Sequence, residues 1–475
     1  MLQFSCMILL LLSLNAQQIA AVVLTPEKVA ELALQQGYQS QEIDLQFRSL
    51  KYQWVEAQSA FDWKLTAETN FENDRFQTFS PNTLVDAKYE RQRTALGLER
   101  NFLTGTLLTV AMNRLQQKSD SVSPASQIQD VYGVLLKQSL VGNFFGQADR
   151  AEISSKKTSY DAASVQRLRE LQDSVLDAVK LFWEAFVARE NYRESQNTRD
   201  RYQKLADSVA KKSRVGFASP GELPQVQAEL EGRLQRVQQA SLDFVSKETQ
   251  LSLLLKLGKT ENLDLQAELR IPELPKLQEL DLTELRAFRE QSLRVEAQRS
   301  LESAVQAKSD VTLAWLLGAQ FSGNDPSAGT ASREALSASY PKYSTGLQLE
   351  WKFGSEVLKE ELASKRALRM KEEIRFERLR ASLLDQKNYL SLKLQSARNV
   401  ALSHERTRAL RQQVVQEVNK SYSQGRTELK NLIDALNAQS NAEVQWIRSV
   451  GDYQIALNEF AAFADQLVRY KELLQ

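Results

Sequence analysis

The residues that most often carry enzymatic chemistry are scarce in this sequence. His404 is the single histidine and Cys6 the single cysteine among 475 residues. His404 lies in a polar stretch with helical spacing, which is typical of a surface histidine, and no glycine-rich phosphate loop follows an extended segment. The carboxylates alternate with basic residues, for example around Lys359, as on a solvated and ion-paired helix face. The sequence therefore predicts no enzyme, no cofactor and no metal site.

The composition favours long helices and argues against nucleic-acid binding. The chain has 9 prolines, 17 glycines and 25% charged residues, a balance that suits long helices better than a series of small domains. Its formal net charge is +1, and no basic block is long enough to follow a phosphate backbone. We expect no nucleic-acid partner.

The N-terminus has the pattern of an export signal. Residues 1–21 contain no charge, and an apolar run is followed by small residues at Ala20 and Ala21, which indicates a secretory signal peptide. Cys6 precedes the apolar run, whereas a lipidated cysteine would follow it, so a lipid anchor is not expected. No later stretch approaches about 18 consecutive apolar residues, so we expect no membrane-spanning helix. An exported chain of this kind is periplasmic, secreted or a membrane barrel.

Several segments alternate apolar and polar residues, as a strand with two different faces requires. The alternation is clear over about 61–76 and 340–353, weaker over 128–141 and 311–323, and continues in an extra hairpin over 92–114 that turns at Thr104 and Gly105. Trp63, Trp315 and Trp351 fall in these segments, where indole rings would face lipid at headgroup level. The alternative is a buried face of a β-sandwich.

The apolar residues of the remaining sequence have helical spacing and predict two long hairpins. The first covers 147–258 and turns at Gly216, and the second covers 355–470 and turns at Gly425, 209 positions later. The recurrence predicts an internal duplication with repeats over 22–270 and 271–475. The predicted fold is mainly α with membrane β, each repeat consisting of helix, strands and a long helical hairpin.

A set of two to four strands leaves unpaired edges, and each unpaired backbone group costs several kcal/mol in lipid. The strands must therefore close into a barrel with strands of other copies. The helical hairpins have apolar residues enough to pack against a neighbour but no globular core of their own, so we expect them to form a tube.

The chain resembles the TolC-like outer-membrane efflux proteins over residues 22 to 470. The resemblance rests on the passage from Lys137 to Ala148, the turn around Gly216, and the helix end at Leu253 to Gly258. It implies a homotrimer with a trimeric α-helical periplasmic barrel and an outer-membrane β-barrel. The trimer would be a passive exit for an inner-membrane pump, joined to it by a periplasmic adaptor. The family usually has four strands per chain, and the sequence leaves open whether the extra hairpin joins the barrel as two more.

The resemblance also implies roles for residues near the two turns. Counting six and nine residues from Gly425 gives Asn431 and Asp434 as pore-constriction positions, so one acidic ring is lost and one is kept. Tyr422 and Glu222 match a phenol–carboxylate pair that latches the tip shut. The turn residues expected to contact the adaptor are Val215, Gly216, Phe217, Gln424, Gly425 and Arg426.

Each of these roles has a simpler alternative. Asp434 is otherwise a solvated residue on a polar helix face, Tyr422 and Glu222 are two unrelated exposed side chains, and the two glycines only end their helices. For the whole chain, the alternative is a secreted or periplasmic coiled-coil scaffold with a small soluble sheet.

Overall fold

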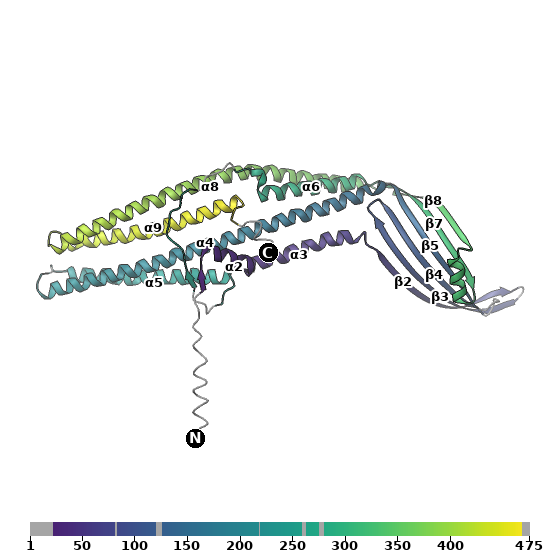
Figure 1. Ribbon diagram of the computed structural model, residues 1–475, viewed down its shortest axis with the longest axis horizontal. Helices are drawn as coiled ribbons and strands as arrows, with labels where there is room; N and C mark the ends of the chain where they lie inside the picture. Colours follow the sequence, from purple (N-terminus) through teal and green to yellow (C-terminus); the bar gives the residue numbers. More distant parts are fainter. Residues whose placement is uncertain are drawn as a thin grey trace, which may run out of the picture. The chain divides into compact units, whose positions relative to one another are not determined.

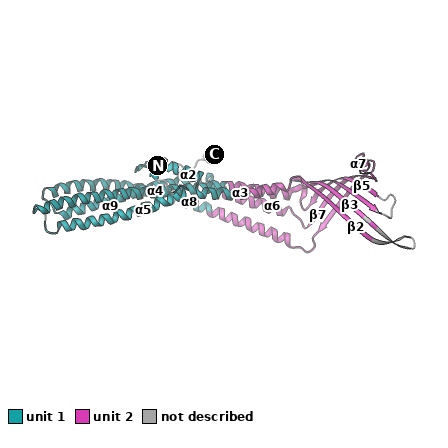
Figure 2. Ribbon diagram, turned by 90° about the horizontal axis from the view of Figure 1, so that it is seen from below, with its two compact units in different colours: residues 1–47, 165–289, 379–475 teal, residues 48–164, 290–378 magenta. Residues whose placement is uncertain are grey.

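The computed structural model describes residues 22–80, 83–119, 126–217, 219–258, 263–274 and 280–467. The predicted signal peptide, residues 1–21, lies outside these ranges. The chain divides into two units (Figure 2). The helical unit contains Met1–Phe47, Val165–Arg289 and Leu379–Gln475, and the sheet unit contains Arg48–Ser164 and Glu290–Arg378.

Two long helical hairpins make up most of the helical unit, and the first helix of each begins in the sheet unit (Figure 1). They are α4 (Gln147–Arg214) with α5 (Glu222–Leu254), and α8 (Val357–Ser423) with α9 (Leu429–Phe463). Helix α4 has 68 residues and α8 has 67, while α5 has 33 and α9 has 35. These matching lengths support the internal duplication, which stays a prediction.

The two hairpins turn with the same backbone chemistry. Phe217 N–H donates to the carbonyl of Lys212 at 2.9 Å, and Arg426 N–H donates to that of Ser421 at 2.9 Å. Gly216 and Gly425 have φ of 77° and 70°, the left-handed conformation that a Schellman helix end requires and that glycine adopts without a Cβ clash.

The core of the helical unit includes elements that the sequence did not predict. Strand β1 (Val22–Leu24) pairs in parallel with β6 (Leu263–Leu265), next to α2 (Pro26–Gln35). Leu24 and Leu265 are buried together with Phe182 and Phe186 of α4 and Leu251 of α5. Three-residue strands carry too little alternation to be recognised in a sequence.

The sheet unit contains one six-stranded antiparallel sheet, in the order β2-β3-β4-β5-β7-β8. The strands are β2 (Lys64–Ser80), β3 (Thr83–Phe102), β4 (Thr106–Ser119), β5 (Ser126–Val141), β7 (Val311–Asp325) and β8 (Pro341–Trp351). Helix α3 (Tyr38–Ser59) precedes β2, and α6 (Arg286–Gln306) precedes β7. The extra hairpin, β3–β4, is part of this sheet, which therefore has six strands and not four. Its first strand starts nine residues before the predicted position.

The register gives the sheet two chemically different faces. One row of directly paired residues crosses all six strands: Leu65, Leu98, Val110, Val134, Ala319 and Tyr343. The next row is Thr66, Gly97, Ala111, Gly133, Gln320 and Lys342. Because successive side chains point to opposite sides of a strand, these rows lie on what we call the apolar face and the polar face.

A short helix that the sequence did not predict, α7 (Ala328–Leu336), packs on the apolar face of β5 and β7. Below it the buried Asp130 accepts two hydrogen bonds of 2.7 Å from Arg114 and one of 2.6 Å from Ser332 of α7. A Cβ at Gly323 would lie 2.1 Å from the carbonyl oxygen of Ala331, so this glycine permits the close approach. In the part of the chain described, none of the helices is both long and apolar enough to span a membrane.

Candidate functional site

The two turns expose different chemistry at the tip of the helical unit. At the α4–α5 turn, Phe217 is 83% exposed and Val215 is 66% exposed. At the α8–α9 turn, Gln424, Gly425 and Arg426 are all exposed. A Cβ added at either turn glycine would meet no atom within 4 Å. The tip thus offers an apolar turn beside a polar, cationic turn.

The predicted constriction residues share one face of α9. Asn431 and Asp434 are both exposed, whereas Leu429, Leu432 and Ile433 are buried. Asn431 Nδ2 donates to Oγ1 of Thr427 at 2.9 Å, one helical turn towards the tip. Thr427, Asn431 and Asp434 therefore form a polar stripe that points away from the core of their own protomer.

The predicted latch residues lie near each other but do not form a hydrogen bond. Tyr422 is 8% exposed, and its hydroxyl has no hydrogen-bond partner among the described residues. Burial, and then the negative charge of Glu222, raise the pKa of Tyr422. Lys212 of α4 places its Nζ 4.1 Å from the centre of the Tyr422 ring, a cation–π contact that the sequence did not predict. The latch stays a prediction.

The three tryptophans predicted to face lipid lie at the end of the sheet where its strands meet the helices. Trp315 and Trp351 are on the apolar face, and Trp63 lies one residue before β2. Their exposed fractions are 42% for Trp315, 47% for Trp63 and 55% for Trp351. Trp315 Nε1 donates to Oγ1 of Thr345 at 2.9 Å, so its polar atom is satisfied while the ring is accessible to lipid.

Solved outer-membrane channels have a fold similar to that of this chain. The Campylobacter jejuni CmeC outer membrane channel is 11% identical, with a TM-score of 0.68 over 94% of this chain and 86% of that chain. The open state of the Neisseria gonorrhoeae MtrE outer membrane channel is 13% identical, with a TM-score of 0.68 over 94% and 90%. This chain has the TolC-like channel fold.

The predicted mainly helical fold with long helices and strands is thereby confirmed, whereas the closed barrel and the trimer stay predictions. A further structure agrees with this fold. The outer membrane protein VceC of Vibrio cholerae is 12% identical, with a TM-score of 0.66 over 93% of this chain and 97% of that chain. No protein-family model and no curated protein matches the sequence. The likeness to the TolC-like channels is thus one of fold.

A buried polar network lies on the tip side of this TolC-like helical unit. Arg233 of α5 is 5% exposed, and its Nη2 donates to Asn437 Oδ1 of α9 at 2.6 Å and to Glu229 Oε2 at 2.8 Å. The hydroxyl of Tyr202 of α4 donates to the same Asn437 oxygen at 2.6 Å. Three of the four hairpin helices are therefore joined at one amide oxygen. The available signal was an arginine at a position where the apolar spacing of α5 calls for an aliphatic residue.

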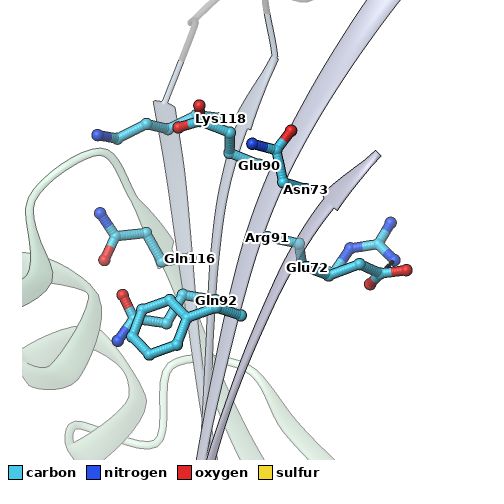
Figure 3. Close-up of a pocket in the computed structure, with 8 residues that line it drawn as sticks. Glu72, Asn73, Glu90, Arg91, Gln92, Gln116 and Lys118 are labelled. Atoms are coloured by element: carbon cyan, nitrogen blue, oxygen red, sulfur yellow. Dashed lines mark hydrogen bonds and ion pairs between the residues drawn. The ribbon is translucent and has the colours of Figure 1, made fainter. Parts of the chain in front are cut away.

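The apolar face of the TolC-like sheet ends in polar residues (Figure 3). Gln92, Gln116 and Lys118 project from that face, whereas Glu72 and Arg91 project from the opposite side of the strands. Arg91 and Glu72 form an ion pair of 3.2 Å on the polar face. Strands β2 to β4 therefore continue beyond the apolar band, which marks one boundary of the surface suited to lipid.

Proposed function

We propose that this chain is a passive outer-membrane exit duct of a tripartite efflux or secretion system, and that it works as a homotrimer in the outer membrane. The observation that carries the proposal is a sheet with a continuous apolar face and two unpaired edges, joined to long helical hairpins. A soluble protein would expose this face to water at a large free-energy cost, since each Å² of apolar surface costs roughly 25 cal/mol.

Closure of the sheet requires other copies of the chain. Strands β2 and β8 are the two ends of the sheet, and backbone N–H and C=O groups along an edge have no water to bond inside lipid. Pairing β2 of one copy with β8 of the next satisfies both edges in a ring. Three copies is the number that the TolC-like resemblance implies.

The helical tip is the proposed contact for the periplasmic adaptor that joins the duct to an inner-membrane pump. Val215 and Phe217 offer apolar surface of the kind that forms the centre of a protein interface. Gln424 and Arg426 offer polar groups of the kind found at its rim. The likeness of the whole fold to the CmeC and MtrE channels supports a conduit rather than an enzyme.

Asp434 is proposed to line the narrow entrance as a ring of three carboxylates. Such a ring favours cations and binds multivalent cations tightly. In planar-bilayer recordings of the purified trimer, we expect millimolar trivalent cation to block the current. Asp434→Asn should reduce the block at least tenfold, and Asn431→Asp should strengthen it by adding a second ring.

The control for this experiment is Asp207→Asn on α4, an exposed carboxylate that we do not place in the pore. It should leave the block unchanged. If Asp434→Asn behaves like this control, the proposal of a channel is kept but the proposal of an acidic ring at Asp434 is wrong. If the purified protein is water-soluble and forms no channels, the coiled-coil scaffold replaces the duct.

A further inference from the structure

The extra hairpin is an integral part of the sheet. Strand β3 pairs with β2 from Glu99–Lys64 to Thr83–Ser80, and β4 pairs with β5 from Thr106–Gln138 to Lys118–Ser126. The hairpin therefore separates β2 from β5, and neither strand could pair directly with the other while it is in place.

The turn of this hairpin is fixed to the junction between β5 and α4. Ser139 N–H donates to the carbonyl of Gly105 at 3.0 Å, and Gln138 Nε2 donates to that of Thr104 at 3.0 Å. A Cβ at Gly146 would lie 2.0 Å from the carbonyl oxygen of Leu103. Only glycine permits so close an approach of two backbones, so the turn is held in place at the base of the sheet.

Both faces of the hairpin continue the faces of the sheet. Leu96, Leu98 and Val110 lie on the apolar face and are exposed by 36% to 44%. Ala95, Ala111 and Asn113 alternate with them on the polar face. An excursion outside the membrane would have no use for this alternation, whereas a barrel wall requires it.

We infer that the trimer has a barrel of eighteen strands, wide enough that the outer-membrane end does not limit the size of the cargo. This inference rests on the proposed trimer. With strands about 4.8 Å apart and tilted by about 40°, eighteen strands enclose a backbone diameter of roughly 36 Å, against roughly 24 Å for the twelve that would form without the hairpin. After side chains are subtracted, hydrated cargo of roughly 20 Å across would pass.

The lining added by the hairpin fits bulky hydrated cargo. It contributes both signs of charge, with Arg93 and Glu99 on the same face of β3, together with small and amide side chains such as Ala111 and Asn113. Mixed charge on a polar wall selects neither cations nor anions strongly. Selection by charge and size is therefore left to the helical entrance.

Cysteine accessibility tests whether the hairpin is barrel wall. In a Cys6→Ser background, single cysteines replace Ala95 and Ala111 on the polar face and Leu96 and Val110 on the apolar face. Gln348→Cys and Leu347→Cys are the matched pair on β8. A membrane-impermeant thiol reagent applied to the trimer in lipid vesicles should label positions 95, 111 and 348 at least tenfold faster than 96, 110 and 347.

The β8 pair separates this inference from the proposed function. If β8 alternates and the hairpin does not, the eighteen-stranded barrel is wrong and the duct stands. If β8 fails to alternate as well, the membrane barrel itself is wrong.

Polymer exclusion tests the calibre. In planar bilayers, neutral polyethylene glycols of about 10 Å hydrodynamic radius, added on the sheet side, should enter the full-length channel and reduce its current. A variant in which a short turn replaces residues 83–119 keeps β2 and β5 antiparallel, and it should exclude these polymers. The same size limit in both channels would overturn the inference. If the shortened variant does not fold, the full-length channel still tests the inference, because exclusion of the polymers from it would overturn the inference as well.

Discussion

At the scale of single residues, the packing of the helical unit includes polar groups that are buried between the apolar faces of its helices. Arg233, Tyr202 and Asn437 share hydrogen bonds where aliphatic side chains would otherwise meet. A buried arginine without partners would cost several kcal/mol, so the three residues are energetically coupled. The spacing of apolar residues in the sequence identified the packing face of each helix. Because spacing does not show which two helices pack against each other, the hydrogen-bond network could not be predicted.

The Tyr202 hydroxyl should make stability depend on alkaline pH. Burial raises the pKa of Tyr202 to about 12 from an ordinary value of 10.0. Between these values the folded protein keeps the proton and the unfolded chain loses it, so the free energy of unfolding decreases as pH rises from 10 to 12, by up to about 3 kcal/mol. Thermal unfolding in detergent should show this decrease. Tyr202→Phe should remove the pH dependence between 10 and 12, and it should lower the free energy of unfolding by about 1 kcal/mol near neutral pH.

Tyr422→Phe should have the opposite effect on stability near neutral pH. Its hydroxyl is buried and has no hydrogen-bond partner in the part of the chain that the structure describes, so removing it should leave the melting temperature unchanged or raise stability by up to about 1 kcal/mol. Tyr202→Phe is the control, because its hydroxyl does have a partner. A lower melting temperature for Tyr422→Phe, together with a larger closed-state current, would instead support the predicted latch to Glu222 in the assembled trimer.

At the scale of elements, the sequence predicted the strands and helices that have one apolar face and one polar face. Residues 61–76 and 340–353 were recognised because lipid-suited side chains alternate with polar ones. The start of β3 was missed because the residues from Glu90 to Arg93 are polar at successive positions, so the period of two disappears beyond the apolar band. Helix α7 was missed because its nine residues are too short a window for helical spacing to be recognised in the sequence.

The close approach of α4 and α9 should make Gly451 essential for packing, whereas Gly232, which has no such contact, should be replaceable. A Cβ at Gly451 would lie 2.3 Å from Cγ2 of Val187, whereas one at Gly232 would meet nothing within 4 Å. We expect Gly451→Ala to destabilise the protein by about 1–3 kcal/mol and Gly232→Ala to stabilise it by about 0.5–1 kcal/mol. Helical circular dichroism during heating measures both, and equal shifts would show that the two helices adjust freely.

At the scale of the whole molecule, the two faces of the sheet should tolerate charge differently. Leu347 lies on the apolar face and is 69% exposed, and the neighbouring Gln348 lies on the polar face. Leu347→Arg should lower the stability of the membrane-inserted protein by about 2–4 kcal/mol, whereas Gln348→Arg should change that stability little. The fraction of protein recovered as membrane-integrated trimer measures this difference. Similar losses for both variants would contradict a lipid-facing sheet.

The two free edges, β2 and β8, also have a genetic consequence. A copy whose β8 edge is damaged still offers β2, so it enters a ring and leaves that ring open. If normal and damaged copies are made in equal amounts and mix at random in trimers, only about one ring in eight consists of normal copies. Edge mutations should therefore be dominant, whereas a mutation that prevents a copy from folding before assembly should be recessive.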